Sequence, residues 1–173
     1  MTVDRERLLR DEEEGWARFR AAVAAVPPAR AEEPTVTPDG WSPKDTIFHV
    51  AAWLDLCADV IGRIVDGTWD PSTAEEEDPA FVERTNAEQF ERARAMTPRE
   101  VEASLARARE RAREAFASMP EVTPDAWGWF EESGPMHYAK HVHDLAAFAA
   151  GTAPDPEVGP LLQAETDGWL ELV

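Results

Sequence analysis

The sequence predicts an all-α protein, most simply a four-helix bundle. Apolar residues recur at spacings of three and four over long segments, and several of these segments follow a Ser, Thr or Asp joined to a Pro, a helix-start signal. Segments with the strict alternation of a half-buried strand are almost absent. With 173 residues, the chain is most economically one domain with a continuous core. We expect the bundle to occupy residues 1–151 and a tail, 152–173, to pack back on it as a short helix.

The first helix is expected from Asp4 to about Val26, where Pro27 and Pro28 end it. One side of this segment is apolar, so that side should face the core. Its members are Leu9, Trp16, Phe19, Val23 and Val26.

The second helix is expected to start at Ser42 as N-cap, with Pro43 at the first helical position, and to run to about Val65. It is apolar on much of its circumference, so we expect it in the interior of the bundle. Its main stripe is Ile47, Val50, Leu54, Cys57, Ile61 and Ile64.

Two further start signals follow a long connection, residues 67–79. Asp78-Pro79 predicts a third helix to about Ala95, and Thr97-Pro98 predicts that this helix either kinks or restarts and continues to about Met119. We expect residues 120–133 to form an irregular link. Gly134-Pro135 then opens the last main helix, and Gly151 closes it.

Charge and composition limit the classes of function. Seventeen basic against thirty-five acidic residues give a formal net charge of −18, which disfavours nucleic acid and anionic membrane surfaces as partners. The first residues lack the apolar core of a signal peptide, no apolar run is long enough to cross a bilayer, and Cys57 is the single cysteine. We therefore expect a soluble, cytoplasmic protein that binds a small molecule. The sequence leaves a homodimer open.

The histidines carry the clearest chemical pattern. His137 and His141 are four residues apart, which places both imidazoles on one face of a helix. His49 lies in an apolar helix, where an unpaired imidazole is costly to bury. Together they predict a three-histidine metal site with an open position, whereas His143 points to roughly the opposite face. The alternative is that they are ordinary core or surface histidines.

One geometric requirement accompanies this prediction. If the second and last helices run antiparallel with level midpoints, His49 and the pair are about 13 Å apart along the axes. A parallel arrangement or an axial offset of two turns would bring them together.

Other candidate residues are aromatic or amide side chains near these histidines. Trp53 and Tyr138 each neighbour a proposed ligand, and Asn86 is an uncharged amide in a charged helix. Residues 120–133 carry Trp127, Trp129 and Phe130, more large rings than a solvated link needs. We predict that all six line a substrate pocket at the metal. The alternatives are core packing, capping of the bundle end and, for Asn86, a position on the surface.

Two segments resemble a known family. Residues 39–53, from Asp39-Gly40-Trp41-Ser42-Pro43 through His49, resemble the second helix of the DinB-like superfamily, which includes mycothiol-dependent maleylpyruvate isomerases. The run from His137 to Leu145 looks like its fourth-helix motif, and residues 80–97, with Asn86, resemble its third-helix region.

The resemblance covers roughly residues 4–150. It implies an up-down-down-up bundle with one divalent metal, zinc or nickel, on His49, His137 and His141. The mycothiol-dependent isomerases can carry Glu at the position of His137, and this chain departs from them there.

Three functions follow as hypotheses. The first is a metal-dependent transferase or isomerase that uses a low-molecular-weight thiol, such as mycothiol or bacillithiol, on a small electrophile in detoxification or self-resistance. The second is a metal-independent hydrolase resembling the colibactin self-protection proteins. The third is a non-catalytic protein that sequesters a small molecule between its helices.

Overall fold

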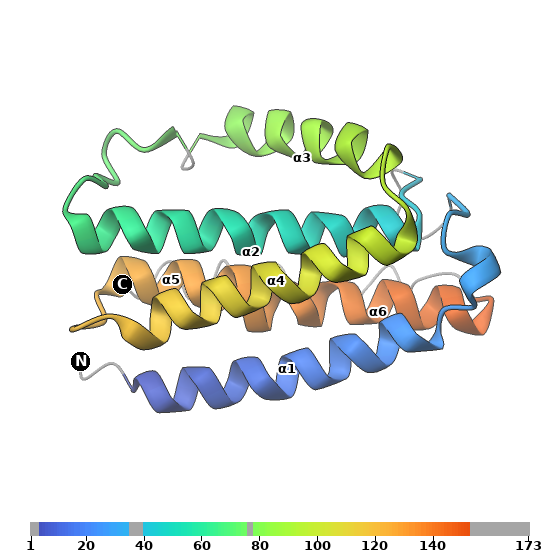
Figure 1. The fold of residues 1–173 in the computed structure, drawn as a ribbon, viewed down its shortest axis with the longest axis horizontal. Helices are drawn as coiled ribbons and strands as arrows, with labels where there is room; N and C mark the ends of the chain where they lie inside the picture. The colour runs from blue at the N-terminus through green and yellow to red at the C-terminus, as the bar shows by residue number, and fades with distance from the viewer. Residues whose placement is uncertain (1–3, 35–39, 76–77, 153–173) are drawn as a thin grey trace.

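The computed structural model describes residues 4–34, 40–75 and 78–152, which form helices and no strand (Figure 1). This confirms the predicted all-α class. The predicted packing of the tail lies outside the described residues, apart from Thr152. In chain order the elements are α1 (Arg5–Ala25), the 3-10 turn η1 (Pro28–Arg30), α2 (Pro43–Asp66), α3 (Pro79–Arg94), α4 (Pro98–Ser118), α5 (Pro124–Glu131), the π-helical segment η3 (Glu132–Met136) and α6 (His137–Ala150).

The bundle has the up-down-down-up topology that the resemblance implies. α1 and α6 run in one direction, and α2 and α4 run side by side in the other (Figure 1). α3 makes this arrangement possible, because it carries the chain back along the outside of α2 before α4 begins (Figure 1). The chain therefore restarts at Thr97 with a reversal of direction.

Cap residues explain where the helices begin. Ser42 and Thr97 each form a reciprocal capping box with the acidic residue three positions later, Asp45 and Glu100. Each cap is followed by a proline at the first helical position, where the missing N–H costs nothing. Gly151 closes α6 in the left-handed conformation, with φ of 71°, as predicted.

The predicted irregular link at residues 120–133 is wrong. Thr123 caps α5 through the amide of Ala126, and α5 continues through η3 into α6 without a break. Pro135 lies inside η3. A proline lacks the N–H of the α-helical ladder and clashes with the preceding turn, and the wider π turn accommodates it. Gly134 and Pro135 therefore mark a local change of pitch within one long helical stretch.

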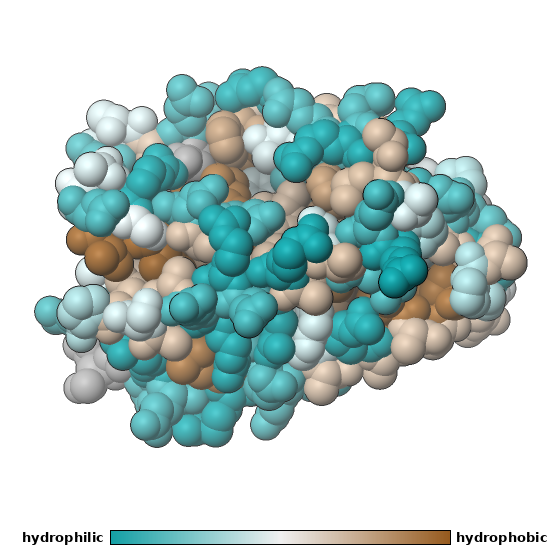
Figure 2. Space-filling view, viewed as in Figure 1, coloured by the Kyte–Doolittle hydropathy of each residue, from teal (hydrophilic) through white to brown (hydrophobic). Residues whose placement is uncertain are grey.

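α2 lies at the centre of the molecule, as predicted, in contact with α3, α4, α5 and α6. Its buried residues include Val50, Leu54, Cys57 and Ile61, which join the main core. The face seen in Figure 2 is mostly hydrophilic, with hydrophobic residues in separate small patches, in keeping with the large negative charge. Among the residues described, no helix has the length and apolar character needed to cross a bilayer.

The buried face of α1 differs from the prediction and includes one charged residue. Leu9 and Trp16 are only partly buried, whereas Leu8 and Glu12 are almost fully buried. Glu12 is not among the residues that the apolar pattern assigns to the core, because its side chain is charged.

Three groups from two other helices surround the Glu12 carboxylate. Arg109 of α4 donates to both oxygens at 2.8 and 3.0 Å, and Arg113 donates at 2.5 Å. The hydroxyl of Tyr138 of α6 donates at 3.1 Å. A buried carboxylate is stable only when its oxygens are paired in this way, so Glu12 fixes α1 against α4 and α6.

We expect Glu12→Ala to lower the free energy of unfolding by about 3 kcal/mol, because two arginines and a phenol lose their shared acceptor in a low-dielectric setting. Tyr138→Phe removes one hydrogen bond to a charge and should cost about 1–2 kcal/mol. Glu13→Ala is the control: Glu13 also pairs with Arg109, but 57% of its side chain is exposed, and the loss should stay below about 1 kcal/mol. Urea denaturation measures all three, and equal losses for Glu12→Ala and Glu13→Ala would contradict the assignment.

Candidate functional site

Three histidines from two helices meet between α2 and α6. The ring centroid of His49 lies 4.7 Å from that of His137 and 5.3 Å from that of His141, and the last two are 5.0 Å apart. One nitrogen of each ring lies within 4.8 Å of the corresponding nitrogens of the other two. The cluster that the sequence predicts therefore exists as a candidate metal site.

The helix missed at residues 124–131 explains why these histidines meet. With α5 and η3 included, the helical stretch Pro124–Ala150 has its midpoint at residue 137, so the pair lies at and just beyond that midpoint. His49 lies before the midpoint of α2, which runs in the opposite direction (Figure 1). His49 and the histidine pair are therefore displaced from the midpoints of their helices toward the same end of the bundle. With level midpoints, their separation along the helix axes is about 5 Å at 1.5 Å per residue, in place of about 13 Å.

Two of the three imidazoles are oriented by hydrogen bonds. Nδ1 of His49 donates to the amide oxygen of Gln89 at 3.0 Å, and Nδ1 of His141 donates to the carboxylate of Asp144 at 3.3 Å. Since the acceptors are an amide oxygen and a carboxylate, the proton resides on Nδ1 and the lone pair on Nε2. This is how metal-ligating histidines are commonly held.

One ring nitrogen of the cluster is buried and without a hydrogen-bond partner. Nε2 of His141 accepts no hydrogen bond from any described residue, and the histidine itself is only 5% exposed. A buried nitrogen lone pair without a partner costs free energy, and coordination to a metal would satisfy it. The donor set of three imidazoles therefore fits a divalent ion of the zinc or nickel type.

Burial keeps all three imidazoles neutral. It lowers the pKa of His49 to about 3, with a further contribution from His141, while the bond to Gln89 opposes the change. Burial also lowers the pKa of His137 and of His141, and for His141 the carboxylate of Asp144 opposes it. Neutral imidazole is the form that binds metal, so near neutral pH the site needs no deprotonation before an ion binds.

Aromatic and amide groups surround His49. The ring of Trp41 meets that of His49 edge to face at 4.8 Å and stacks on Phe90 at 6.5 Å. The ring of Trp53 lies 6.2 Å from that of His49, and its indole N–H donates to Asn86 at 3.1 Å. The structure thus places Trp53 beside His49 and Asn86 beside Trp53, and the substrate contact of both residues stays a prediction.

Sequence reasoning missed Trp41 and Gln89 as site residues. Trp41 lies directly before the cap Ser42, eight residues before His49. Gln89 follows Asn86 by three residues on α3, so the two amides share one helix face. That spacing is the one sequence observation that could have found Gln89.

Two predicted pocket residues belong to the core instead. Tyr138 is fully buried, and its ring packs at 5.4 Å on Phe19 and 5.8 Å on Trp16. It turns toward α1 because its position on α6 is about 100° from that of His137. Phe130 stacks on Phe116 at 4.2 Å inside the bundle. Substrate contact by these two rings is therefore corrected to core packing.

Trp127 and Trp129 are neither fully buried in the core nor shown to contact the histidines. Both are partly buried against the core, and the indole N–H of Trp127 donates to Glu131 at 3.0 Å. Their substrate contact stays a prediction.

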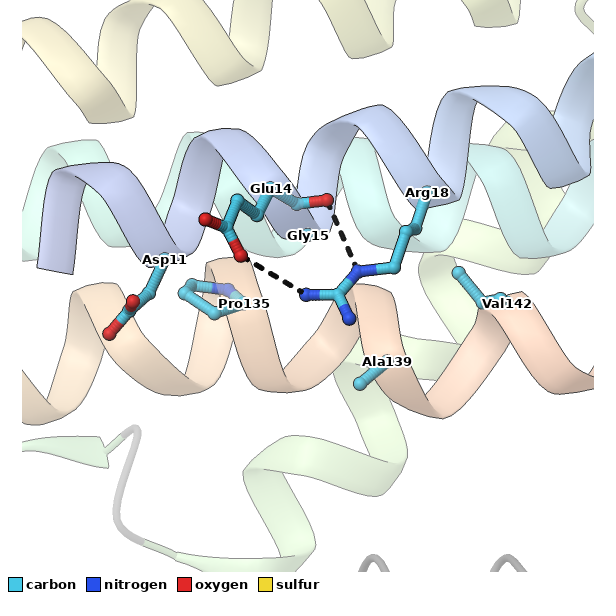
Figure 3. Close-up of a pocket in the computed structure, with 7 residues that line it drawn as sticks. All are labelled: Asp11, Glu14, Gly15, Arg18, Pro135, Ala139 and Val142. Atoms are coloured by element: carbon cyan, nitrogen blue, oxygen red, sulfur yellow. Dashed lines mark hydrogen bonds and ion pairs between the residues drawn. The ribbon is translucent and has the colours of Figure 1, made fainter.

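Two surface grooves lie between the helices that carry the candidate site and their neighbours. One, of about 370 Å³, runs between α1 and α6, where Asp11, Gly15 and Arg18 face Pro135, Ala139 and Val142 (Figure 3). Gly15 lets the helices approach, since a Cβ there would lie 3.2 Å from the Tyr138 ring. The other, of about 310 Å³, lies between α2, α3 and α4, and Gln89 forms part of its wall.

The comparison with protein families matches residues 13–139 to the mycothiol maleylpyruvate isomerase N-terminal domain. The chain belongs to this family. The matched range includes His49 and His137 and ends two residues before His141. Membership in this DinB-like family agrees with the bundle topology. Neither the curated proteins nor the solved structures gave a significant match.

We expect the purified protein to bind about one divalent ion per chain. His49→Ala, His137→Ala and His141→Ala should each lower the occupancy severely, because each removes one of three converging nitrogens. His143→Ala is the matched control, since His143 is turned about 200° from His141 on α6. Elemental analysis after reconstitution and desalting measures the occupancy. Equal loss in all four variants would show that a different face of α6 binds the ion.

We expect the metal-free protein to lose stability in acid because of His49. Above pH 6.5 the imidazole is neutral in both the folded and the unfolded chain and contributes no pH dependence. Below pH 6.5, His49 is protonated in the unfolded chain but stays neutral in the folded chain down to about pH 3. The free energy of unfolding therefore falls as the pH falls. The expected slope is about 1.4 kcal/mol per pH unit for this group.

The measurement is denaturant unfolding in chelator at pH 7.0 and 5.5 for wild type and His49→Gln. The variant should lose less stability over this interval, since the acidic side chains titrate alike in both proteins. Identical losses would show that His49 is not held neutral by the fold.

Proposed function

We propose that this protein is a metal-dependent transferase or isomerase that uses a low-molecular-weight thiol of the mycothiol type on a small electrophile. The observation that carries the proposal is the convergence of His49, His137 and His141, with Nε2 of His141 buried and without a partner. Membership in the mycothiol maleylpyruvate isomerase N-terminal domain family supports a role for a thiol.

The neutrality of the donors supports an anionic co-substrate. Three uncharged imidazoles leave the charge of a divalent ion uncompensated, whereas the glutamate that related isomerases can carry at the position of His137 would offset part of it. A divalent ion held there would supply Lewis-acid chemistry and lower the pKa of a thiol bound to it. A thiolate is the anionic form that reacts with electrophiles.

The remaining residues would prepare the site for this chemistry. Gln89 and Asp144 hold the rings of His49 and His141 with Nε2 available. Trp41 and Trp53 both lie beside His49 and would exclude water from it. Asn86 fixes the indole of Trp53, so this aromatic wall is rigid. A dry, aromatic surrounding suits a small electrophile better than a charged polymer.

Cys57 does not supply the thiol. It is fully buried, and burial raises the pKa of its thiol to about 12. A cysteine so rarely ionised is a poor nucleophile, which supports the use of an external thiol.

We expect thiol-dependent turnover by the metal-loaded protein. The experiment supplies mycothiol or bacillithiol with electrophiles such as maleylpyruvate and 1-chloro-2,4-dinitrobenzene and follows the product by chromatography. Removal of metal and the substitution His141→Ala should each reduce the rate at least tenfold, while His143→Ala should retain it.

Two results would contradict the proposal. Product formation that needs neither thiol nor metal would favour the hydrolase. Stoichiometric binding of the electrophile without any product would favour the sequestering protein.

A further inference from the structure

One cation stands beside the histidine cluster. Lys140 lies on α6 three residues after His137 and directly before His141, and its side chain is exposed. Residues three apart on a helix are neighbours on its surface, with Cβ atoms about 5–6 Å apart. At about 100° per residue, Lys140 is turned only about 60° from His137. The ammonium group therefore belongs to the rim of the site.

This lysine has no ion-pair or hydrogen-bond partner among residues 4–34, 40–75 and 78–152. The sequence holds one other lysine, Lys44, which is buried and bound to Glu32 at 2.5 Å and to the carbonyl of Met96 at 3.1 Å. Lys44 is thus structural. The chain carries thirty-five acidic residues and a net charge of −18, yet none of the acidic residues that the structure describes pairs with Lys140.

The nearest acidic group on α6 is already in use. Asp144 lies four residues after Lys140, which is a common spacing for a helical ion pair. Its carboxylate instead accepts from Nδ1 of His141 at 3.3 Å. Burial is the main cause of the lowered pKa of all three histidines, and the nearby positive charge of Lys140 makes a smaller contribution to each.

We propose that Lys140 is the specificity-determining residue of the site and selects small ligands that carry a carboxylate or another anionic group beside the atom that meets the histidines. This inference rests on the proposed function, since it takes the histidine cluster as the place where the ligand binds. It adds the substrate class: a small anionic thiol or electrophile. A single cation at the rim favours such ligands because the surrounding protein surface repels them.

The test measures ligand binding rather than turnover. The protein is loaded with Co²⁺, whose visible spectrum changes when its ligands change, and is titrated with 3-mercaptopropionate, 2-mercaptoethanol and cysteamine. The three are short-chain thiols that carry an anionic, a neutral and a cationic group. The quantity of interest is the ratio of affinities between wild type and Lys140→Gln for each probe, because this ratio cancels the intrinsic differences between the thiols.

We expect Lys140→Gln to weaken the binding of 3-mercaptopropionate about three- to tenfold. This is the size of effect that one charge has over several ångströms near a protein surface. The loss for 2-mercaptoethanol should be smaller and that for cysteamine smaller still. Lys140→Arg should retain the wild-type order. Arg107→Gln on α4 is the matched control: Arg107 is exposed and the net charge changes by the same unit, but the residue lies on a helix that holds none of the histidines.

Equal weakening of the three thiols by Lys140→Gln, or the same effect from Arg107→Gln, would overturn the inference. Azide and imidazole, titrated in parallel, separate it from the proposed function. If no thiol changes the spectrum, the proposed function fails. The inference about Lys140 then stands if Lys140→Gln weakens the binding of azide, an anion, but not that of imidazole, a neutral ligand. It falls if the binding of both is unaffected.

Discussion

The Glu12 carboxylate is the constraint on which the arrangement of the helices depends. It is 1% exposed and joins α1 to Arg109 and Arg113 of α4 and to Tyr138 of α6. Burying such a charge is costly unless every oxygen is paired, so only a narrow range of helix positions satisfies it. Tyr138 directly follows His137 on α6. The hydrogen bond from its hydroxyl to Glu12 therefore also fixes the rotation of α6 about its own axis. Tyr138, turned about 100° from His137 on α6, thus helps to determine where the histidines point.

The candidate site is built in two layers from different parts of the chain. The inner layer consists of three neutral imidazoles on α2 and α6. In the outer layer, Gln89 and Asp144 orient the rings of His49 and His141 by hydrogen bonds. Trp41 and Trp53 also belong to this layer and lie beside His49. Since α3 supplies both Gln89 and Asn86, the crossover helix is part of the site as well as a connection.

Local sequence rules predicted most of the fold. The pairs Ser42-Pro43, Asp78-Pro79 and Thr97-Pro98 located three helix starts, because capping and the fixed φ of proline act within one turn. The same rule applies to Thr123-Pro124, which caps α5, but Gly134-Pro135 also resembles a helix start and hides the continuity of the two segments in the sequence. The histidine cluster was also predictable from spacing. The burial of Glu12, the inward turn of Tyr138 and the bond from His49 to Gln89 depend on packing between helices, which one sequence does not reveal.

The placement of α3 outside the bundle has a consequence for how such proteins diversify. α3 packs chiefly on α2, and its connections to α2 and α4 leave the contacts between α1, α4 and α6 untouched (Figure 1). Substitutions along α3 can therefore alter the outer wall of the site with little effect on the core. The three histidines and the outer wall that α3 contributes are, in this sense, separable parts of the candidate site: a lineage could keep the histidines and the buried carboxylate while changing the residues that surround them.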